Sequence, residues 1–391
     1  MYGRPHMRSN GFSLIEIMVG LLIGMFGVLI VLQLLSATDT SRRITVGSGD
    51  AQINGIASLY GIDRDVREAG LGISAFTLLG CSLTYATATD LVTVTLAALA
   101  PVTINPAPSL VPAGDIQTDT LLVIGGSSSS PSEGDALTAA STGGFYQVTA
   151  ASSFVIGDRV IAAPATRSSP CTLTLGKVVA IGGSVLTVSP STASIAAGGA
   201  VYNLGASPSI HAYAIRNGNL TRCDYFAYDC GAAKYVSPVD STVWVPVASN
   251  VVSLRAQYAR DTSGISGAVS SMDGVVDSYD QITPGSSADA TGIPLYCRWI
   301  RVIGLRMVLV ARSQQYDPKF TSGTPTWDGA SVNTSITSTL LTLTPTATAI
   351  DLGANAEWSH YRYKPIQTTI MLRNAVWQGG QVTYQGGSGG C

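Results

Sequence analysis

The sequence has little charge and little histidine. Only 12% of its 391 residues are charged, about half of the ~25% that is usual for soluble domains. Its 22 basic and 24 acidic residues nearly cancel, for a net charge of −2. With no basic excess to bind phosphates, we expect no nucleic-acid partner.

Signatures of catalysis are also missing. The three histidines, His6, His211 and His360, are too few for a His-rich metal site. The sequence has no GxSxG, HExxH, P-loop or Rossmann fingerprint. We therefore expect neither an enzyme nor a bound cofactor or metal.

Four aspartates lie near one another in the sequence, as the carboxylate ligands of a calcium site would: Asp261, Asp273, Asp277 and Asp280. An EF-hand needs the pattern D-x-[DN]-x-[DN]-G with a glutamate at position 12, and this stretch lacks it. Solvated loop acids are the simpler interpretation, and a calcium site at 261–280 stays open.

Long apolar runs are missing as well, with one exception. Residues 17–35 contain no charge, and at ~1.5 Å per residue they reach about 28 Å, close to the ~30 Å hydrocarbon core of a bilayer. The flank before them carries Arg4 and Arg8. A basic flank stays on the cytoplasmic side, so we expect a single-pass protein with the rest of the chain across the membrane.

One carboxylate lies at the edge of this apolar run. Glu16 is costly there unless it has a partner. If the chain were cut after Gly11, Phe12 would offer a new α-ammonium that could neutralise Glu16 of a neighbouring subunit. Gly20 and Gly24 form a GxxxG pattern in the same run, which favours close helix packing.

The segment GFSLIE at 11–16 resembles the class III signal of type IV pilins and type II secretion pseudopilins. The resemblance implies cleavage between Gly11 and Phe12 by a prepilin peptidase, N-methylation of Phe12, and registration of the subunit in a filament by Glu16. A Sec signal peptide is the alternative, with Leu35-Ser36-Ala37 as its cleavage site. The apolar run exceeds the ~7–15 residues usual for such signals.

Later segments resemble the PilW family of minor pilins, among them RDVREAGLG at 64–72 and the stretches 301–312 and 361–374. Pseudopilin J of type II secretion is similar at 64–72.

The resemblance to PilW implies a place in a tip or initiation complex that supports pilus assembly, adhesion and motility. It implies as partners the prepilin peptidase, other minor pilins, the major pilin, an inner-membrane assembly platform and a large tip adhesin. It implies an inner-membrane subunit with a periplasmic head that later enters the pilus. A type II secretion pseudopilin and a secreted β-rich binding protein remain alternatives.

The pattern predicts an α+β, pilin-like fold with one long N-terminal helix on an antiparallel β-rich head. We expect a leader at 1–11, a transmembrane and filament-core helix at 12–35, its amphipathic continuation at 36–72, a β-rich elaboration at 73–200, and the β-sheet of the head with a Gly-rich tail at 201–391. We expect the apolar stripe of the amphipathic helix to consist of Ile56, Leu59, Tyr60, Val66 and Ala69. The charges at 63–68 are interpreted as a solvated helix face, with a contact between subunits as the alternative. Strands are expected at 119–124, 299–310 and 366–373, and a hairpin at 177–188.

Six cysteines follow the apolar run: Cys81, Cys171, Cys223, Cys230, Cys297 and Cys391. Placed beyond the membrane they would face an oxidising compartment. Six cysteines allow 15 connectivities, but the short separation favours a Cys223–Cys230 disulfide.

Overall fold

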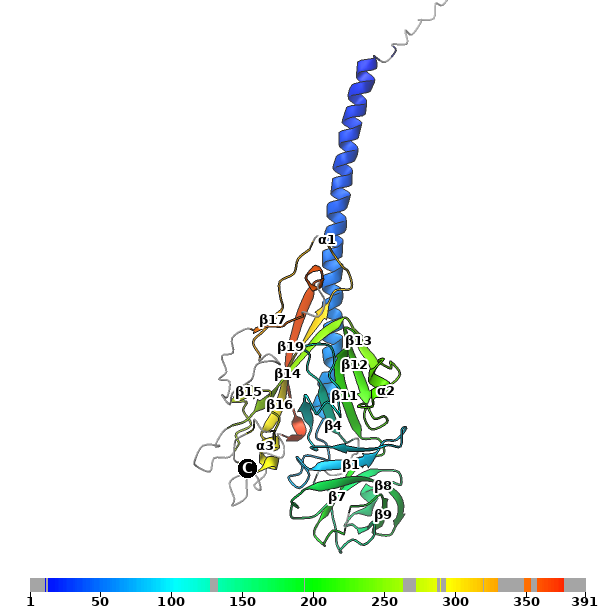
Figure 1. Cartoon of the computed structure of the whole chain (residues 1–391), viewed down its shortest axis with the longest axis vertical. Coiled ribbons are helices and arrows are strands. Elements are labelled where there is room, and N and C mark those ends of the chain that lie inside the picture. The colour runs from blue at the N-terminus through cyan, green and yellow to red at the C-terminus, as the bar shows by residue number, and fades with distance from the viewer. Residues whose placement is uncertain are drawn as a thin grey trace, which may run out of the picture.

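A long helix dominates the molecule. The computed structural model describes residues 11, 13–126, 133–192, 194–262, 272–286, 289, 293–318, 320–329, 348–352 and 357–375. Helix α1, Leu14–Glu68, is continuous over 55 residues, about 82 Å at the helical rise of 1.5 Å per residue. Figure 1 shows it as a rod whose N-terminal half projects from a β-rich head. The predicted α+β class and long helix are confirmed.

The C-terminal end of α1 is fixed to the head by hydrogen bonds. Gly70 has a φ of +85°, a conformation that glycine adopts without steric cost. Its N–H donates to the carbonyl of Ile124 at 2.9 Å. The side-chain amide of Asn374 donates to the carbonyls of Glu68 and Ala69 at 3.3 and 2.9 Å. The helix therefore ends where the sequence predicts, at the GLG of residues 70–72.

The face by which α1 packs on the head agrees with the predicted stripe at Leu59, Val66 and Ala69 and differs from it at Ile56 and Tyr60. Ile56 and Tyr60 point to solvent, with exposed fractions of 51% and 72%. The buried positions are instead mostly small: Gly47, Ala51, Gly55, Ser58, Ile62, Val66 and Ala69. A Cβ on Gly55 would overlap the Ile366 side chain. Small side chains let the helix lie close against the sheet, which a pattern of large apolar residues does not indicate.

The described part of the head contains four sheets. The eight-stranded sheet consists of β1 (Ser82–Ala86), β2 (Thr93–Leu96), β5 (Asp135–Ala136), β6 (Phe145–Gln147), β7 (Arg159–Ala163), β8 (Thr172–Gly182), β9 (Val185–Ser189) and β10 (Ala200–Gly205). The five-stranded sheet consists of β3 (Val102–Ile104), β4 (Leu121–Gly125), β11 (Ser209–Arg216), β12 (Asn219–Asp224) and β13 (Val245–Ser249). The four-stranded sheet consists of β14 (Val251–Arg260), β15 (Ser278–Asp280), β16 (Val302–Arg312) and β19 (Tyr363–Met371). β17 (Thr326–Trp327) pairs with β18 (Thr348–Ala349). Short helices complete the described elements: η1 (Ala151–Ser153), α2 (Ala233–Val236), α3 (Leu295–Ile300) and η2 (Trp358–His360).

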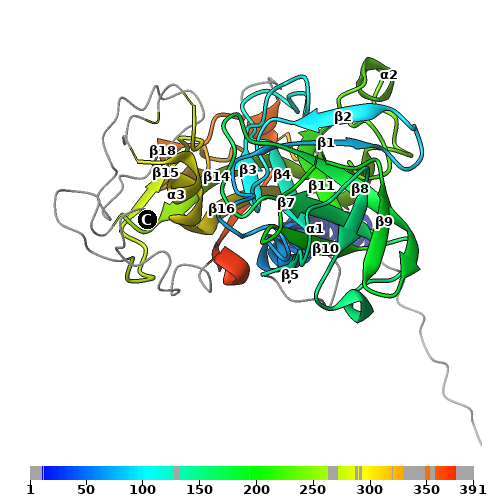
Figure 2. The same ribbon diagram turned by 90° about the horizontal axis from the view of Figure 1, so that it is seen from below.

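The sheets take different places around the helix. Helix α1 contacts β16 and β19 of the four-stranded sheet and β4 and β13 of the five-stranded one. The eight-stranded sheet lies at the end of the head farthest from the projecting half of α1 (Figure 1). Seen from below, β14, β15 and β16 lie on one side of the head, and β8 and β9 on the other (Figure 2). Residues 82–205 thus supply a distal lobe as well as two strands of the five-stranded sheet.

Separate apolar clusters hold these layers together. The first joins Ile62 and Val66 of α1 to Leu121 of the five-stranded sheet and Leu309 of the four-stranded sheet. A second links the five- and eight-stranded sheets, and a third fills the distal lobe around Tyr146. Helix α1 therefore shares one core with both of the sheets that it contacts. Its C-terminal half and the head thus form a single packed unit.

Most of the predicted strands are present. The hairpin of β8 and β9 turns at Gly183, where φ is +62°, as the Gly-Gly signal predicts. Residues 119–124 and 366–373 overlap β4 and β19. The predicted strand at 299–310 was wrong at its start, because residues 295–300 form α3 and only then does β16 begin.

Candidate functional site

The N-terminal half of α1 is an apolar surface that the head does not cover. Leu14–Thr38 is long and apolar enough to cross a membrane, and none of it is buried. Its large side chains are all exposed, from 44% at Leu29 to 76% at Leu14. A core helix of a soluble protein would be covered by its own chain. This half of α1 therefore requires lipid or neighbouring helices to remove it from water.

The signal residues lie at the start of this helix. Gly11 is exposed, and Phe12 lies outside the described residues. Ser13 has extended backbone, and its carbonyl accepts the first helical hydrogen bonds from the N–H groups of Glu16 and Ile17 at 3.0 and 3.2 Å. Glu16 thus stands in the first turn, exposed, where a carboxylate interacts favourably with the helix dipole.

Gly20 and Gly24 have open space where a Cβ would be. No contact within the described chain therefore requires glycine at either position. This open space is compatible with the close helix packing that the GxxxG pattern predicts, and that packing stays a prediction.

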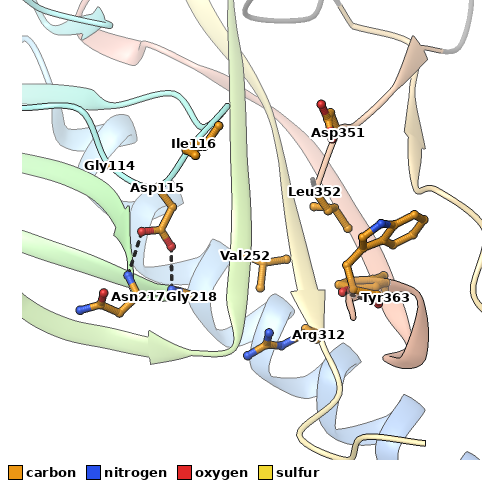
Figure 3. Close-up of a pocket in the computed structure, with 11 residues that line it drawn as sticks. Gly114, Asp115, Ile116, Asn217, Gly218, Val252, Arg312, Asp351, Leu352 and Tyr363 are labelled. Carbon is orange, nitrogen blue, oxygen red and sulfur yellow. Dashed lines mark hydrogen bonds between the residues drawn. The ribbon is translucent and has the colours of Figure 1, made fainter. Parts of the chain in front are cut away.

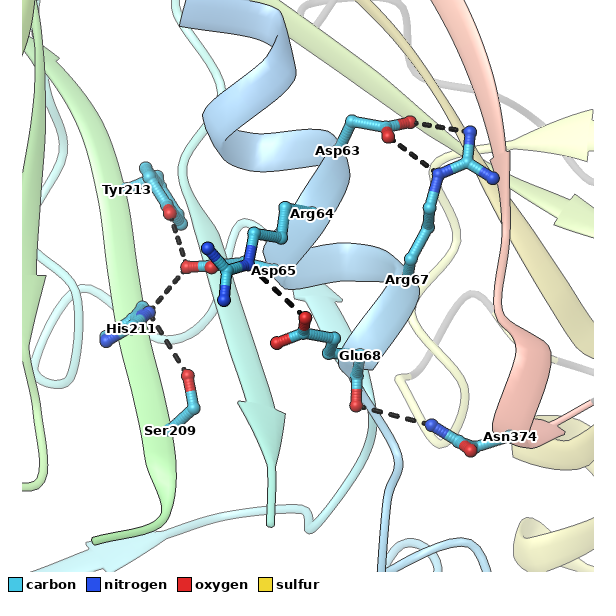
Figure 4. A network of polar contacts seen from close by, with 9 residues as sticks. All are labelled: Asp63, Arg64, Asp65, Arg67, Glu68, Ser209, His211, Tyr213 and Asn374. Carbon is cyan, nitrogen blue, oxygen red and sulfur yellow. Dashed lines mark hydrogen bonds and ion pairs between the residues drawn. The ribbon is translucent and has the colours of Figure 1, made fainter. Parts of the chain in front are cut away.

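A polar network joins the other end of α1 to the five-stranded sheet (Figure 4). Asp65 contacts Nδ1 of His211 at 2.5 Å and accepts a hydrogen bond from the Tyr213 hydroxyl at 2.6 Å. The hydroxyl of Ser209 lies 3.2 Å from the same nitrogen of His211. Both rings come from β11, so a single carboxylate ties the helix to this strand.

Burial by itself would raise the pKa of the Asp65 carboxyl. Hydrogen bonds from His211 and Tyr213, together with the charges of His211 and Arg222, more than offset this and hold the pKa below its ordinary value of 3.8. For Tyr213, burial and then the Asp65 carboxylate raise the pKa of the phenol. Asp65 is therefore ionised and Tyr213 protonated at neutral pH, which is the pairing the geometry requires.

The other charges of the segment behave differently from Asp65. Arg67 pairs with Asp63 at 2.6 Å and Arg64 with Glu68 at 3.3 Å, each one helical turn apart. Arg64–Glu68 is exposed and Arg67–Asp63 is partly exposed, and surface pairs of this kind contribute little to stability. The interpretation of 63–68 as a solvated face thus holds for these four residues and was wrong for Asp65, which turns inward.

A pocket of about 540 Å³ lies where the five- and four-stranded sheets meet (Figure 3). Its lining includes Arg312, Trp358 and Tyr363. Asp115 accepts hydrogen bonds from the N–H groups of Asn217 and Gly218 at 2.9 and 2.7 Å, and Asp351 accepts one from Gln117 at 2.7 Å. The pocket has the volume of a small-molecule site. Its two carboxylates, however, are already hydrogen-bonded to the surrounding loops and hold them in place.

The four aspartates at 261–280 do not share one environment. Asp261 and Asp280 are buried, with exposed fractions of 0% and 4%. Asp280 forms a two-bond ion pair with Arg260 at 2.6 and 3.0 Å, and Asp261 accepts from the N–H of Gly274 at 2.8 Å. The interpretation of all four as solvated acids was wrong for these two. Within the described parts of the chain, no group of three or more His, Cys, Asp or Glu residues is placed to hold a metal.

The cysteines give the head covalent links. Cys223 is joined to Cys230, the pairing that their short separation favours, and Cys81 is joined to Cys171 across 90 residues. Cys297 is also disulfide-bonded. Cys391 lies outside the described residues.

Comparison with known proteins gives two matches. Residues 230–374 match the family model of the type IV pilus-assembly protein W, PilW. Residues 6–32 match the prokaryotic N-terminal methylation motif. Neither the curated proteins nor the solved structures gave a match. The matched regions are the signal with its apolar helix and, in the head, α2 and β13 to β19.

A prepilin-type signal on an uncovered apolar helix, followed by a β-rich head, defines a pilin-like protein associated with type IV pili. More particularly, the two matches support a PilW-type minor pilin, and the resemblance seen in the sequence is confirmed. Proteins of this family are structural. The motif implies contact with a prepilin peptidase and with other pilins, and with the apolar helix it fits a membrane-anchored pilin.

The network around Asp65 was not predicted from the sequence. Asp65 and His211 are 146 residues apart, and each sits in a segment with no chemical motif. The local signal is the residue four positions further along the helix. Asp63 and Arg64 each have a residue of opposite charge there, whereas Asp65 has Ala69. A charge without such a neighbour is a candidate for a tertiary contact.

Proposed function

We propose that this chain is a minor pilin of a type IV pilus, a structural component of the tip or initiation complex that supports assembly, adhesion and motility. The observation that carries the proposal is the combination of the prepilin signal with an uncovered apolar helix that is continuous with the packed core of a PilW-like head.

Anchoring in the inner membrane is the first stage of the proposed function. Residues 1–11 are the leader, and removal of it exposes the amine of Phe12, which is then methylated. Residues 12–35 hold the subunit in the bilayer, with the amphipathic part to residue 72 and the head in the periplasm. The disulfides Cys81–Cys171 and Cys223–Cys230 support this placement, since disulfides persist in oxidising compartments.

Assembly is the second stage. The amine of Phe12 and the carboxylate of Glu16 are each costly in an apolar filament core unless they are paired. Pairing between neighbouring subunits would set their register, and Gly20 and Gly24 would let neighbouring helices approach closely. The partners we propose are the other minor pilins, the major pilin, the assembly platform of the inner membrane and a large tip adhesin.

Glu16→Ala tests this role. Membrane insertion should be retained, because the apolar span is unchanged and a charge is lost. Co-purification with other minor pilins and the number of pili per cell should both fall, because the Phe12 amine loses its partner. Gln33→Ala, which removes the uncharged polar residue of the span, serves as the matched control and should assemble normally. Normal assembly of Glu16→Ala would contradict the registering role.

The matched family name supports the type IV pilus over a type II secretion filament. The continuity of α1 through Thr38 into the head argues against a Sec signal that ends at Ala37, because cleavage there would cut within the helix.

A further inference from the structure

The strand directions identify which end of the head faces the membrane. The Cβ position of Gly55 lies 3.2 Å from the Ala311 side chain, and that of Gly47 lies 3.4 Å from Ser313. Strand β16 therefore runs toward the apolar half of α1. Strand β19 is antiparallel to β16, with Tyr363 opposite Arg312. The segments that follow β16 and precede β19 thus lie on the membrane side of the sheet, beside the middle of α1 in Figure 1.

Aromatic residues are concentrated in these two segments. Residues 316–320 and 358–363 contain Tyr316, Phe320, Trp358, Tyr361 and Tyr363, in a chain that is only 7% aromatic. We call these five side chains, together with His360, the aromatic end. The ring of Tyr316 lies 5.3 Å from that of His360 and 5.5 Å from that of Tyr361. Tyr316 is 40% exposed at the outside of this cluster.

The aromatic end is held in one arrangement. The N–H of Asp317 donates to the carbonyl of His360 at 3.0 Å, and that of Ser322 donates to Ser359 at 2.7 Å. Arg362 forms an ion pair with Asp317 at 3.0 Å and stacks over Phe320 at 4.1 Å. Because the two segments are tied together, the aromatic end is presented as one surface.

The gap between the bilayer and the head is short enough for the aromatic end to reach the headgroups. The apolar span ends at Thr38, and α1 meets the sheet at Gly47. Nine residues of helix cover about 14 Å, and the headgroup layer fills roughly 5–8 Å of that on each side of the hydrocarbon. The N–H of Ser313, beside Gly47, donates to the carbonyl of Arg362 at 2.8 Å, and the segments that carry the aromatic end continue from this level beside the middle of α1 (Figure 1). A helix tilt of about 20°, which is average for membrane helices, toward the four-stranded sheet brings this surface into the headgroups.

We infer that the aromatic end is a membrane-docking surface, which rests in the headgroup layer of the periplasmic leaflet while the subunit awaits assembly. Tyr and Trp favour this layer because their rings are apolar and their tips polar. The exposed cation Lys364 directly follows Tyr363 in β19, and the exposed Arg42 lies on α1 between the end of the apolar span and Gly47; cations at these places suit anionic headgroups. The inference rests on the proposed anchoring by α1, and it adds that the head is docked on the lipid and must lift off when the subunit enters a filament.

The test uses the fluorescence of the full mature chain in vesicles of phosphatidylethanolamine and phosphatidylglycerol that contain a lipid with a nitroxide on its headgroup. The nitroxide should quench tryptophan emission, and Trp358→Phe should remove most of the quenched signal. Trp299→Phe is the matched control, because Trp299 is 1% exposed and lies in α3, before the opposite end of β16. That variant should keep the quenched signal. Tyr316→Glu, at an exposed position, should weaken the quenching without releasing the protein from the membrane.

Retention in membranes after carbonate washing separates the two proposals. A chain that is washed off would overturn the anchoring itself. A retained chain in which Trp358→Phe and wild type are quenched alike would overturn only the docking surface. Quenching that disappears when the protein is diluted in excess lipid would also overturn it, since the surface would then be a contact between copies of the chain.

Discussion

The hydroxyl of Tyr213 donates a 2.6 Å hydrogen bond to the carboxylate of Asp65, and this bond joins the last turns of α1 to the centre of the five-stranded sheet. The tie lies one turn before the helix ends at Glu68, whose carbonyl accepts a hydrogen bond from the side-chain amide of Asn374. A strand from the middle of the chain and the segment that follows β19 thus both fix the last turns of α1. Any force carried by α1 must pass to the head through these turns and the packed face above them.

Asp65→Asn should lower the free energy of unfolding by about 1.5–3 kcal/mol at pH 7, the contribution of hydrogen bonds to a charged group. The measurement is denaturant unfolding of the full chain in detergent. Asp63→Asn is the matched control, because it alters a partly exposed surface pair on the same helix, and it should cost less than ~1 kcal/mol. Equal losses from the two variants would contradict a structural role for the network.

The same carboxylate makes stability depend on pH. The pKa of Asp65 is lower in the folded protein than its ordinary value of 3.8. Its ionised form therefore stabilises the fold above that value, and the contribution is lost as the pH falls through the lower folded pKa. Between neutral pH and pH 3, the melting temperature of wild type should fall further than that of Asp65→Asn. Parallel curves would show that Asp65 has the same pKa in both states.

Gly55→Ala should destabilise the protein even though alanine is the better helix former. The added methyl group would overlap Ile366, and overpacking costs typically 1–3 kcal/mol. Gly61→Ala is the control on the same helix: its Cβ would meet nothing within 4 Å, so stability should rise by up to ~1 kcal/mol. Thermal unfolding of both variants in detergent compares them. A stabilised Gly55→Ala protein would mean that α1 can move away from the sheet.

These residues also show how far the sequence could predict the structure. The apolar half of α1 and the hairpin at 177–188 are local patterns, and both were predicted. The packing face was missed at Ile56 and Tyr60 because its close contacts use glycine, alanine and serine, which hydrophobic periodicity does not mark. The Asp65–His211 contact joins residues 146 apart, so it depends on tertiary packing that a local pattern does not contain.

The disulfides should differ in their effect on stability. Cys81–Cys171 closes a loop of 90 residues and Cys223–Cys230 a loop of seven. Loop-closure entropy then assigns about 4–5 kcal/mol to the first and about 2–2.5 kcal/mol to the second. Replacing each pair by alanines and measuring denaturant unfolding compares them, and peptide mapping without reduction checks the connectivity. A greater loss from the short loop would point to strain or contacts in place of chain entropy.

Processing of the N terminus is the last prediction. Protein from the native host should begin at Phe12 and contain 380 residues, because removal of 11 from 391 leaves 380. The leader carries Arg4 and Arg8, so the side-chain balance of the mature chain becomes 20 − 24 = −4. Intact-mass analysis should show this chain with one added methyl group on the Phe12 amine. Substitution of Gly11 should block the cut and leave the two arginines in front of the apolar span. In that precursor Phe12 has no free amine to pair with Glu16, so it should stay in the membrane without entering pili. A mature chain that begins at Thr38 would contradict the prediction, since it would leave the head without the apolar half of α1.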